Sequence, residues 1–135
     1  MANDYFCPHC RSSLNPGAHV VMRISHRRQR GLILLSPQVG NYRRVLPEGF
    51  DLESGELVDF SCPVCGGDLT SPVDRKLGEV LLRRGVDEYA RVNFSKVFGE
   101  RATFVVETSG VHPYGAHAAR YDDLNFFGEG RSKSP

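Results

Sequence analysis

All four cysteines of the chain fall in two copies of one motif, Cys7-Pro8-His9-Cys10 and Cys62-Pro63-Val64-Cys65. The two-residue gap lets both sulfurs of a pair reach one metal ion from a tight turn, called a knuckle, and two knuckles complete a tetrahedral set of four thiolates. Zn²⁺ accepts such a set with bonds of about 2.3 Å. We therefore predict one Zn²⁺ per chain, bound by Cys7, Cys10, Cys62 and Cys65.

The residues that follow the two knuckles differ. Gly66 and Gly67 follow the second knuckle, where the backbone needs a positive φ and amides that point at sulfur. Arg11 and Ser12 hold the same places after the first knuckle, so we expect that turn to be less regular. We expect His9 to face solvent or to donate a hydrogen bond to a sulfur, rather than to displace a cysteine as a ligand.

A redox site and an iron site are the two alternatives to zinc. Cys7-Pro8-His9-Cys10 alone resembles the motif of thioredoxin-like disulfide oxidants, which place the first cysteine at the N-terminus of a helix. Here the pair is followed by a turn sequence, Leu14-Asn15-Pro16-Gly17, and the second pair would have no role. Iron also binds to four cysteines, but residues 11–61 separate the knuckles and arginines surround the first. These features favour zinc.

The two knuckles and their flanking strands resemble zinc-ribbon proteins, and the knuckles themselves are similar to those of rubredoxins. The resemblance implies a β fold around a Cys₄ metal site. It implies no particular function, since zinc ribbons serve in transcription, translation, enzyme subunits and scaffolds. A second resemblance, to short bacterial zinc-ribbon proteins, rests on Gly31-Leu32-Ile33-Leu34-Leu35-Ser36-Pro37 and on residues 93–104, and it supplies no mechanism.

Between and after the knuckles the sequence predicts β-strands. Residues 19–24 and 32–35 are rich in β-formers and are separated by a polar stretch, which predicts a hairpin with a basic tip. A second hairpin is expected at residues 89–98 and 102–107, with core positions at Val92, Phe94, Phe104 and Val106. The remaining expected strands are short or ambiguous: residues 42–46, 57–60, 68–70 and 77–84.

These elements predict a mainly β fold, a zinc ribbon with a long β-hairpin insertion between the knuckles and a C-terminal β meander. We expect a zinc-ribbon module with the inserted hairpin at residues 1–71 and a β meander packed on it at residues 72–108. Residues 109–135 are expected to form an irregular aromatic segment, with a disordered end at residues 128–135.

The net charge is only +1, but the charges are unevenly distributed. Residues 5–47 contain arginines and no acidic residue, and residues 48–59 contain acidic residues and no basic one. No apolar run is long enough to span a membrane, and the N-terminus lacks the features of a secretory signal. We therefore expect a cytoplasmic protein without a membrane partner, in a compartment where structural disulfides are disfavoured.

Arginines near the predicted hairpin tip form one candidate surface for contact with phosphate or nucleic acid: Arg23, Arg27, Arg28, Arg30, Arg43 and Arg44. Arginine presents a planar fork to phosphate oxygens. The alternatives are a solvated hairpin tip and pairing with the acidic residues 48–59 of the same chain. A net charge of +1 and only three lysines argue against a dedicated nucleic-acid-binding protein.

Aromatic residues near the C-terminus form a second candidate surface: Tyr114, Tyr121, Phe126 and Phe127. If exposed, they would suit docking on a larger protein. The alternative is a segment that folds back over the core of its own domain. His112 and His117 lie nearby, but no carboxylate–histidine spacing supports a second metal site.

The sequence contains no recognisable catalytic motif. It has no Gly-x-Ser-x-Gly elbow, no phosphate-binding Gly-Lys-Ser/Thr loop and no His-Glu-x-x-His motif. A catalytic zinc keeps an open coordination position, whereas four cysteines close the site. The sequence therefore favours a non-catalytic accessory or subunit protein that docks onto a larger protein assembly, such as an enzyme complex. The alternative is a nucleic-acid-binding zinc ribbon that uses the arginines.

Overall fold

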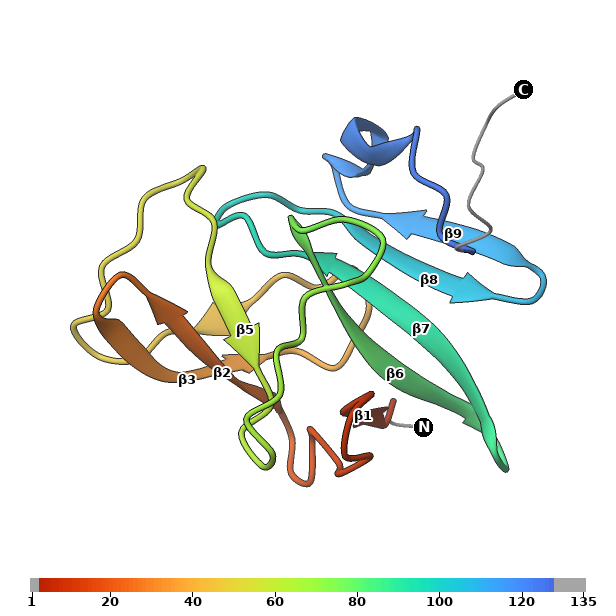
Figure 1. The fold of residues 1–135 in the computed structure, drawn as a ribbon, viewed down its shortest axis with the longest axis horizontal. Coiled ribbons are helices and arrows are strands. Elements are labelled where there is room, and N and C mark those ends of the chain that lie inside the picture. The colour runs from red at the N-terminus through yellow and green to blue at the C-terminus, as the bar shows by residue number, and fades with distance from the viewer. Residues whose placement is uncertain (1–2, 128–135) are drawn as a thin grey trace.

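The computed structural model describes residues 3–127, which form two antiparallel β-sheets (Figure 1). One sheet has the strand order β1-β6-β7-β8-β9, with β1 (Tyr5–Phe6), β6 (Leu77–Gly85), β7 (Glu88–Ser95), β8 (Thr103–Glu107) and β9 (Gly110–Tyr114). The other has the order β4-β3-β2-β5, with β2 (Val20–His26), β3 (Gln29–Leu35), β4 (Arg44–Val45) and β5 (Asp59–Ser61). The predicted mainly β class is confirmed.

The predicted hairpin between the knuckles and the predicted C-terminal meander are both present. β2 and β3 form the hairpin, and its turn is tighter than expected because the ladder runs on to the pair His26 and Gln29. Arg27 makes this turn possible with a left-handed φ of 59°. Strands β6 to β9 follow one another as a meander. The ambiguous residues 77–84 belong to a strand, as the sequence favoured.

The main core lies between the two sheets, whose inner faces both contribute buried side chains. Along β2, Val20, Met22 and Ile24 are buried while Arg23 is exposed, which is the alternation expected of a strand with one face on a core. The facing sheet contributes Val80 and Val92. Burial of this apolar surface is the main stabilising term available to the fold.

A second core lies on the outer face of the five-stranded sheet, because the C-terminal segment folds over it. Phe104 and Val106 point to this face and pack with Tyr121 of the short 3₁₀-helix η1 (Ala118–Tyr121) and with Phe126. Strand β9 was not predicted, because it is a largely exposed edge strand without an alternating pattern. The expected disordered end, residues 128–135, lies outside the described residues.

The chain contains an internal repeat that the sequence analysis did not find. Each half has a short strand, a knuckle, a long hairpin and a further strand: β1 to β4 in the first half and β5 to β8 in the second. Both hairpin turns contain a non-glycine residue with a left-handed φ, 59° at Arg27 and 58° at Asp87. The two sheets accordingly read β1-β6-β7-β8 and β5-β2-β3-β4 in the same order.

The two halves exchange their first strands. β1 pairs with β6, which follows the second knuckle, and β5 pairs with β2, which follows the first. Residues 1–71 and 72–108, which the sequence analysis treated as separate parts, therefore share a sheet. Within the described residues, η1 is the only helix, and no helix is long or apolar enough to cross a membrane.

Candidate metal centre

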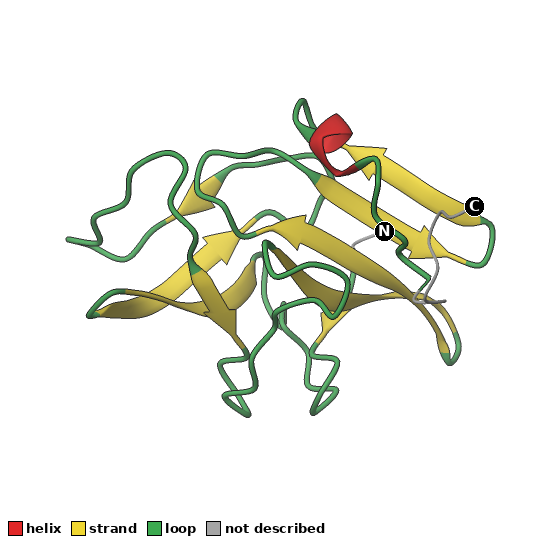
Figure 2. Ribbon diagram, turned by 45° about the horizontal axis from the view of Figure 1, so that its top comes forward, coloured by secondary structure: helices red, strands yellow, loops and turns green. Residues whose placement is uncertain are grey.

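Each sheet delivers one knuckle to the metal centre. Cys7 and Cys10 follow β1 of the five-stranded sheet, and Cys62 and Cys65 follow β5 of the four-stranded sheet. Figure 2 shows the two loops side by side at one end of the molecule, below the point where the sheets approach each other. A metal ion bound here would link the two sheets directly.

The two knuckles have the same backbone geometry. The amide of Arg11 donates to the carbonyl of Cys7 at 2.9 Å, and the amide of Gly66 donates to the carbonyl of Cys62 at the same distance. Both residues have a left-handed φ, 63° for Arg11 and 76° for Gly66. The expectation that the first turn is less regular is therefore wrong, because Arg11 adopts the conformation that glycine adopts in the second turn.

The backbone hydrogen bonds that flank the two knuckles are also equivalent. The amide of Leu14 donates to the carbonyl of Tyr5 at 2.8 Å, and the amide of Leu69 donates to that of Phe60 at 3.0 Å. Leu14 and Leu69 are both fully buried beside their knuckle. Each knuckle is thus closed by a short hairpin that rests on a buried leucine, which fixes the positions of its cysteines.

The four sulfur atoms lie within 4.8 Å of one another. The sulfur of Cys7 is 3.8 Å from that of Cys65, and the sulfur of Cys10 is 3.8 Å from that of Cys62. A regular tetrahedron with metal–sulfur bonds of about 2.3 Å has edges of about 3.8 Å. A disulfide would need a separation of about 2.05 Å, so these are free thiols arranged to hold a metal ion.

Backbone amides supply hydrogen bonds to the first sulfur of each pair. The amides of His9 and Cys10 lie 3.3 and 3.5 Å from the sulfur of Cys7, and those of Val64 and Cys65 lie at the same distances from Cys62. Such bonds stabilise the thiolate form that a metal requires. The first sulfurs of the two knuckles therefore receive equivalent hydrogen bonds from the backbone.

The two cysteines of the first knuckle, Cys7 and Cys10, differ in acidity. Burial raises the pKa of the Cys7 thiol to about 12. Hydrogen bonds from Ser12 lower the pKa of the exposed Cys10 thiol to about 6. A metal ion that binds here must therefore displace a firmly held proton from Cys7, so its binding is coupled to proton release.

His9 connects the two knuckles without serving as a ligand. Its Nε2 atom lies 2.7 Å from the carbonyl oxygen of Asp68, at the base of the second knuckle. The sequence analysis expected this ring to face solvent or to contact a sulfur. The ring is exposed, as expected, and it also packs on the backbone of Gly67, where a side chain would collide with it.

A buried lysine is linked by hydrogen bonds to Asp68, which follows the second knuckle. Lys96 is only 3% exposed, and its Nζ atom donates to Oγ1 of Thr70 at 2.6 Å. The Thr70 hydroxyl in turn donates to Oδ1 of Asp68 at 2.7 Å. The hydrogen bonds that the hydroxyl and the amide of Thr70 donate to Asp68 lower the pKa of this carboxyl group. Sequence reasoning gave these residues no role, since nothing in their spacing indicates that they meet.

The six arginines do not form one surface. Arg23 and Arg30 lie on the outer face of the four-stranded sheet, where they pair with Leu32 and Ser25. Arg27 forms an ion pair with Glu56 at 3.0 Å, which is the pairing with residues 48–59 that the sequence left open. Arg44 turns to the opposite face and lies over the ring of Phe98, 4.3 Å from its centre. Arg28 and Arg43 are exposed.

The aromatic residues of the C-terminal segment separate into two groups. Tyr121 and Phe126 are buried, 6% and 4% exposed, in the core that the segment forms with its own sheet. Of the two alternatives left open by the sequence, these two residues follow the second, in which the segment folds back over its own domain, and they are not available for docking. Tyr114 and Phe127 remain exposed. Within residues 3–127 the four cysteines are the one cluster of metal-binding type, and it does not include His112 or His117.

Comparison with known proteins identifies no relative of this chain: no protein-family model, no curated protein and no solved structure matches it. The interpretation of the site therefore depends on its geometry and chemistry.

Proposed function

We propose that one Zn²⁺ binds the four cysteines and that the protein is a non-catalytic accessory protein, which docks onto a larger protein through the outer face of its four-stranded sheet. Sulfur separations of 3.8 Å, which match the edges of a Zn–thiolate tetrahedron, support the metal assignment. Four thiolates complete the coordination of Zn²⁺, so the ion would have a structural role and hold the two sheets together.

Iron accepts the same four sulfurs as zinc. Closed Cys₄ sites in which the ion only holds the fold together are typical of Zn²⁺. Free thiol ligands also fit a reducing compartment, and we propose the cytoplasm as the location. Iron bound to thiolates would colour the purified protein, whereas Zn²⁺ would leave it colourless.

The docking proposal rests on a contrast between the outer faces of the two sheets. The C-terminal segment covers the outer face of the five-stranded sheet. On the four-stranded sheet, Leu32 and Val45 are 51% and 55% exposed on the equivalent face. Strand pairing assigns the following residues to this face: Val21, Arg23, Ser25, Arg30, Leu32, Leu34, Val45, Asp59 and Ser61.

The charges on this outer face indicate the kind of partner. No carboxylate among the described residues forms an ion pair with Arg23 or Arg30, although Asp59 lies on the same face. Apolar side chains between unpaired arginines suit a protein surface that combines apolar and acidic residues. Single-stranded nucleic acid is favoured less, because none of the residues that strand pairing assigns to this face is aromatic and could stack with bases.

A photo-crosslinking amino acid at position 32 would test the docking proposal in the cells that make the protein. The matched control places the same amino acid at position 86, because Val86 is 90% exposed but lies on the β6–β7 turn. We expect position 32 to crosslink one defined protein and position 86 to crosslink none. Leu32→Asp and Val45→Asp should release that protein, and Val86→Asp should not.

The same experiment separates the alternatives. A crosslink to RNA or DNA from position 32, with binding that weakens steeply as salt rises, would favour the nucleic-acid-binding alternative. Equal crosslinking from both positions, or a partner retained by Leu32→Asp and Val45→Asp, would contradict docking through this face. The metal assignment is tested separately, since each variant should still carry one zinc ion.

A further inference from the structure

A cavity of about 250 Å³ lies between the inner faces of the two sheets. Its walls are mostly apolar and come from both halves of the repeat, with Met22 and Ile33 on one side and Val80 and Phe94 on the other. The cavity opens to solvent on one side, so contact with an apolar ligand would remove apolar wall surface from water.

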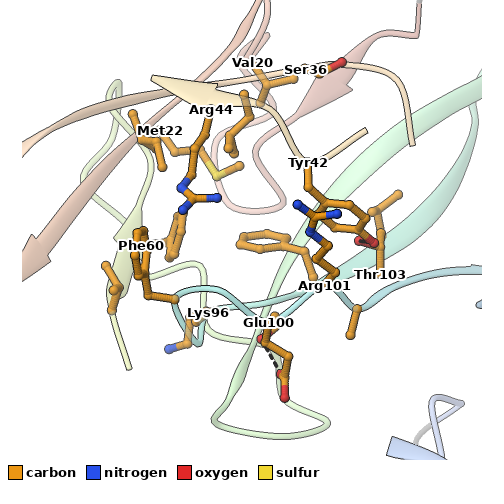
Figure 3. Close-up of a pocket in the computed structure, with 18 of the residues that line it drawn as sticks. Val20, Met22, Ser36, Tyr42, Arg44, Phe60, Lys96, Glu100, Arg101 and Thr103 are labelled. Atoms are coloured by element: carbon orange, nitrogen blue, oxygen red, sulfur yellow. Dashed lines mark hydrogen bonds between the residues drawn. The ribbon is translucent and has the colours of Figure 1, made fainter. Parts of the chain in front are cut away.

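Two arginines border the cavity where it meets the surface (Figure 3). Arg44 comes from β4, in the first half of the repeat, and its side chain reaches into the space between the sheets. Arg101 precedes β8, in the second half, and lies over the ring of Tyr42 at 5.9 Å. A surface depression continues outward from this place along residues 38–43 and again includes Arg101.

Neither guanidinium forms an ion pair with a carboxylate of residues 3–127. The ion pairs among the described residues involve other basic groups, and none includes Arg44 or Arg101. The nearby carboxylate of Glu100 is already used, because it accepts hydrogen bonds from Ser95, Tyr121 and Arg120. Both arginine side chains are exposed, so their donors remain available to an anion.

Lys96 also lines the cavity but is not part of this cationic pair. Its Nζ atom donates to Thr70, as described above, and in Figure 3 its amine points away from Arg44 and Arg101. The hydroxyl of Tyr42 is likewise bound within the protein, 2.9 Å from Oγ1 of Thr103. Arg44 and Arg101 therefore offer free cationic donors at this place, which favours an anionic rather than a neutral head group.

We propose that this cavity binds a small amphipathic organic anion, with an apolar body between the sheets and a carboxylate or phosphate held by Arg44 and Arg101. The site is separate from the metal centre and from the outer sheet face, so this proposal goes beyond docking. The cavity volume suits a short aliphatic chain. Both candidate ligands carry one anionic head group on an apolar chain. Titration distinguishes the carboxylate from the phosphate.

Isothermal titration calorimetry of the metal-loaded full chain with octanoate, octyl phosphate and 1-octanol tests the proposal. At least one of the two anions should bind saturably and more tightly than the alcohol, and the tighter anion identifies the head group. Arg44→Gln and Arg101→Gln should each weaken that anion about tenfold, as expected for loss of one charge-assisted contact, without weakening the alcohol. Arg75→Gln is the matched control, because Arg75 is exposed and does not line the cavity.

Two further measurements keep the result interpretable. Melting temperatures of the variants check that loss of the Arg44 contact with Phe98 has not unfolded the protein. Side-chain methyl shifts in ¹H–¹³C NMR spectra should move at the cavity walls, for example at Ile33 and Val92, and not on the outer face at Leu32. The proposal is overturned if neither anion binds saturably, if Arg44→Gln and Arg101→Gln bind the anion as Arg75→Gln does, or if the shifts lie elsewhere.

Discussion

His9 and Gly67 lie in contact across the two knuckles. A Cβ atom at Gly67 would lie 2.8 Å from Cδ2 of His9 and 3.2 Å from the sulfur of Cys65. The ring is held in this place because its Nε2 atom lies 2.7 Å from the carbonyl oxygen of Asp68. Glycine at position 67 therefore allows a side chain of the first knuckle to pack on the backbone of the second.

Gly67→Ala is expected to weaken zinc binding about tenfold, because the new methyl group must displace the ring of His9 and press on a ligand sulfur. Competition with a chromogenic zinc chelator measures this change. Gly17→Ala is the control, since a Cβ atom at Gly17 would meet nothing within 4 Å. His9→Ala combined with Gly67→Ala should recover part of the loss. Unchanged zinc affinity in Gly67→Ala would show that the contact does not shape the site.

Phe126→Ala should lower the free energy of unfolding by about 3 kcal/mol or more, because it leaves a cavity under the C-terminal segment. Phe127→Ala, one residue further on, should change it by less than about 0.5 kcal/mol, because Phe127 is half exposed. Denaturant unfolding of the metal-loaded variants measures both. Equal effects of the two substitutions would mean that the segment does not cover the sheet as described.

Glu100→Gln should lower the free energy of unfolding by about 1–3 kcal/mol at neutral pH, since it weakens the hydrogen bonds from Ser95 and Tyr121. Arg120 contributes less, because its side chain is largely exposed. Burial alone would raise the pKa of Glu100, but hydrogen bonds from Ser95, Tyr121 and Arg120 outweigh it and hold the pKa below its usual 4.5.

The lowered pKa fixes how this effect depends on pH. A carboxylate with a lowered pKa contributes stability that is complete above its usual pKa and is lost as pH falls through the lowered value. Burial and the hydrogen bond to Glu100 raise the pKa of Tyr121 to about 12, so its hydroxyl stays a donor. The difference between wild type and Glu100→Gln should therefore be constant from about pH 6 to pH 8. A difference that grows or vanishes within this range would contradict the assignment.

Cys62→Ser should unfold much of the chain, because zinc binding contributes on the order of 10 kcal/mol to folding and the ligand lies at the junction of both sheets. Circular dichroism and thermal melting measure the loss, and removal of zinc from the wild type with a chelator should reproduce it. Val64→Ala is the control within the same knuckle, because Val64 is exposed. A Cys62→Ser protein that keeps its strand content and melting temperature without metal would contradict a structural role.

The parts of the fold that could be predicted from the sequence depend on local patterns. The spacing of Cys7 and Cys10 places both sulfurs on one turn whatever surrounds them, and the apolar stretches around β2 and β7 predict strands by composition alone. The exchange of first strands between the halves is not local. Tyr5 pairs with Leu82, which lies far along the chain. A strand of two residues is too short for its hydrophobic pattern to predict which hairpin it joins.

The site was incompletely predicted for a similar reason. Arg11 takes a left-handed conformation that its residue type does not indicate, so the equivalence of the two knuckles was missed. Tyr121 and Phe126 have no helical or strand spacing, because they lie in and after a short 3₁₀-helix, and their burial depends on tertiary packing. Arg44 and Arg101 are far apart in the chain and border one cavity only after the sheets assemble.

Native mass spectrometry of the wild-type protein, purified from its own cells without added metal, tests the central claim most directly. We predict that each chain carries one zinc ion, with protons displaced from its four thiols, and that the preparation is colourless. A folded chain without metal, a chain with iron in place of zinc, or a chain whose cysteines are joined in disulfides would contradict a zinc site that links the two sheets.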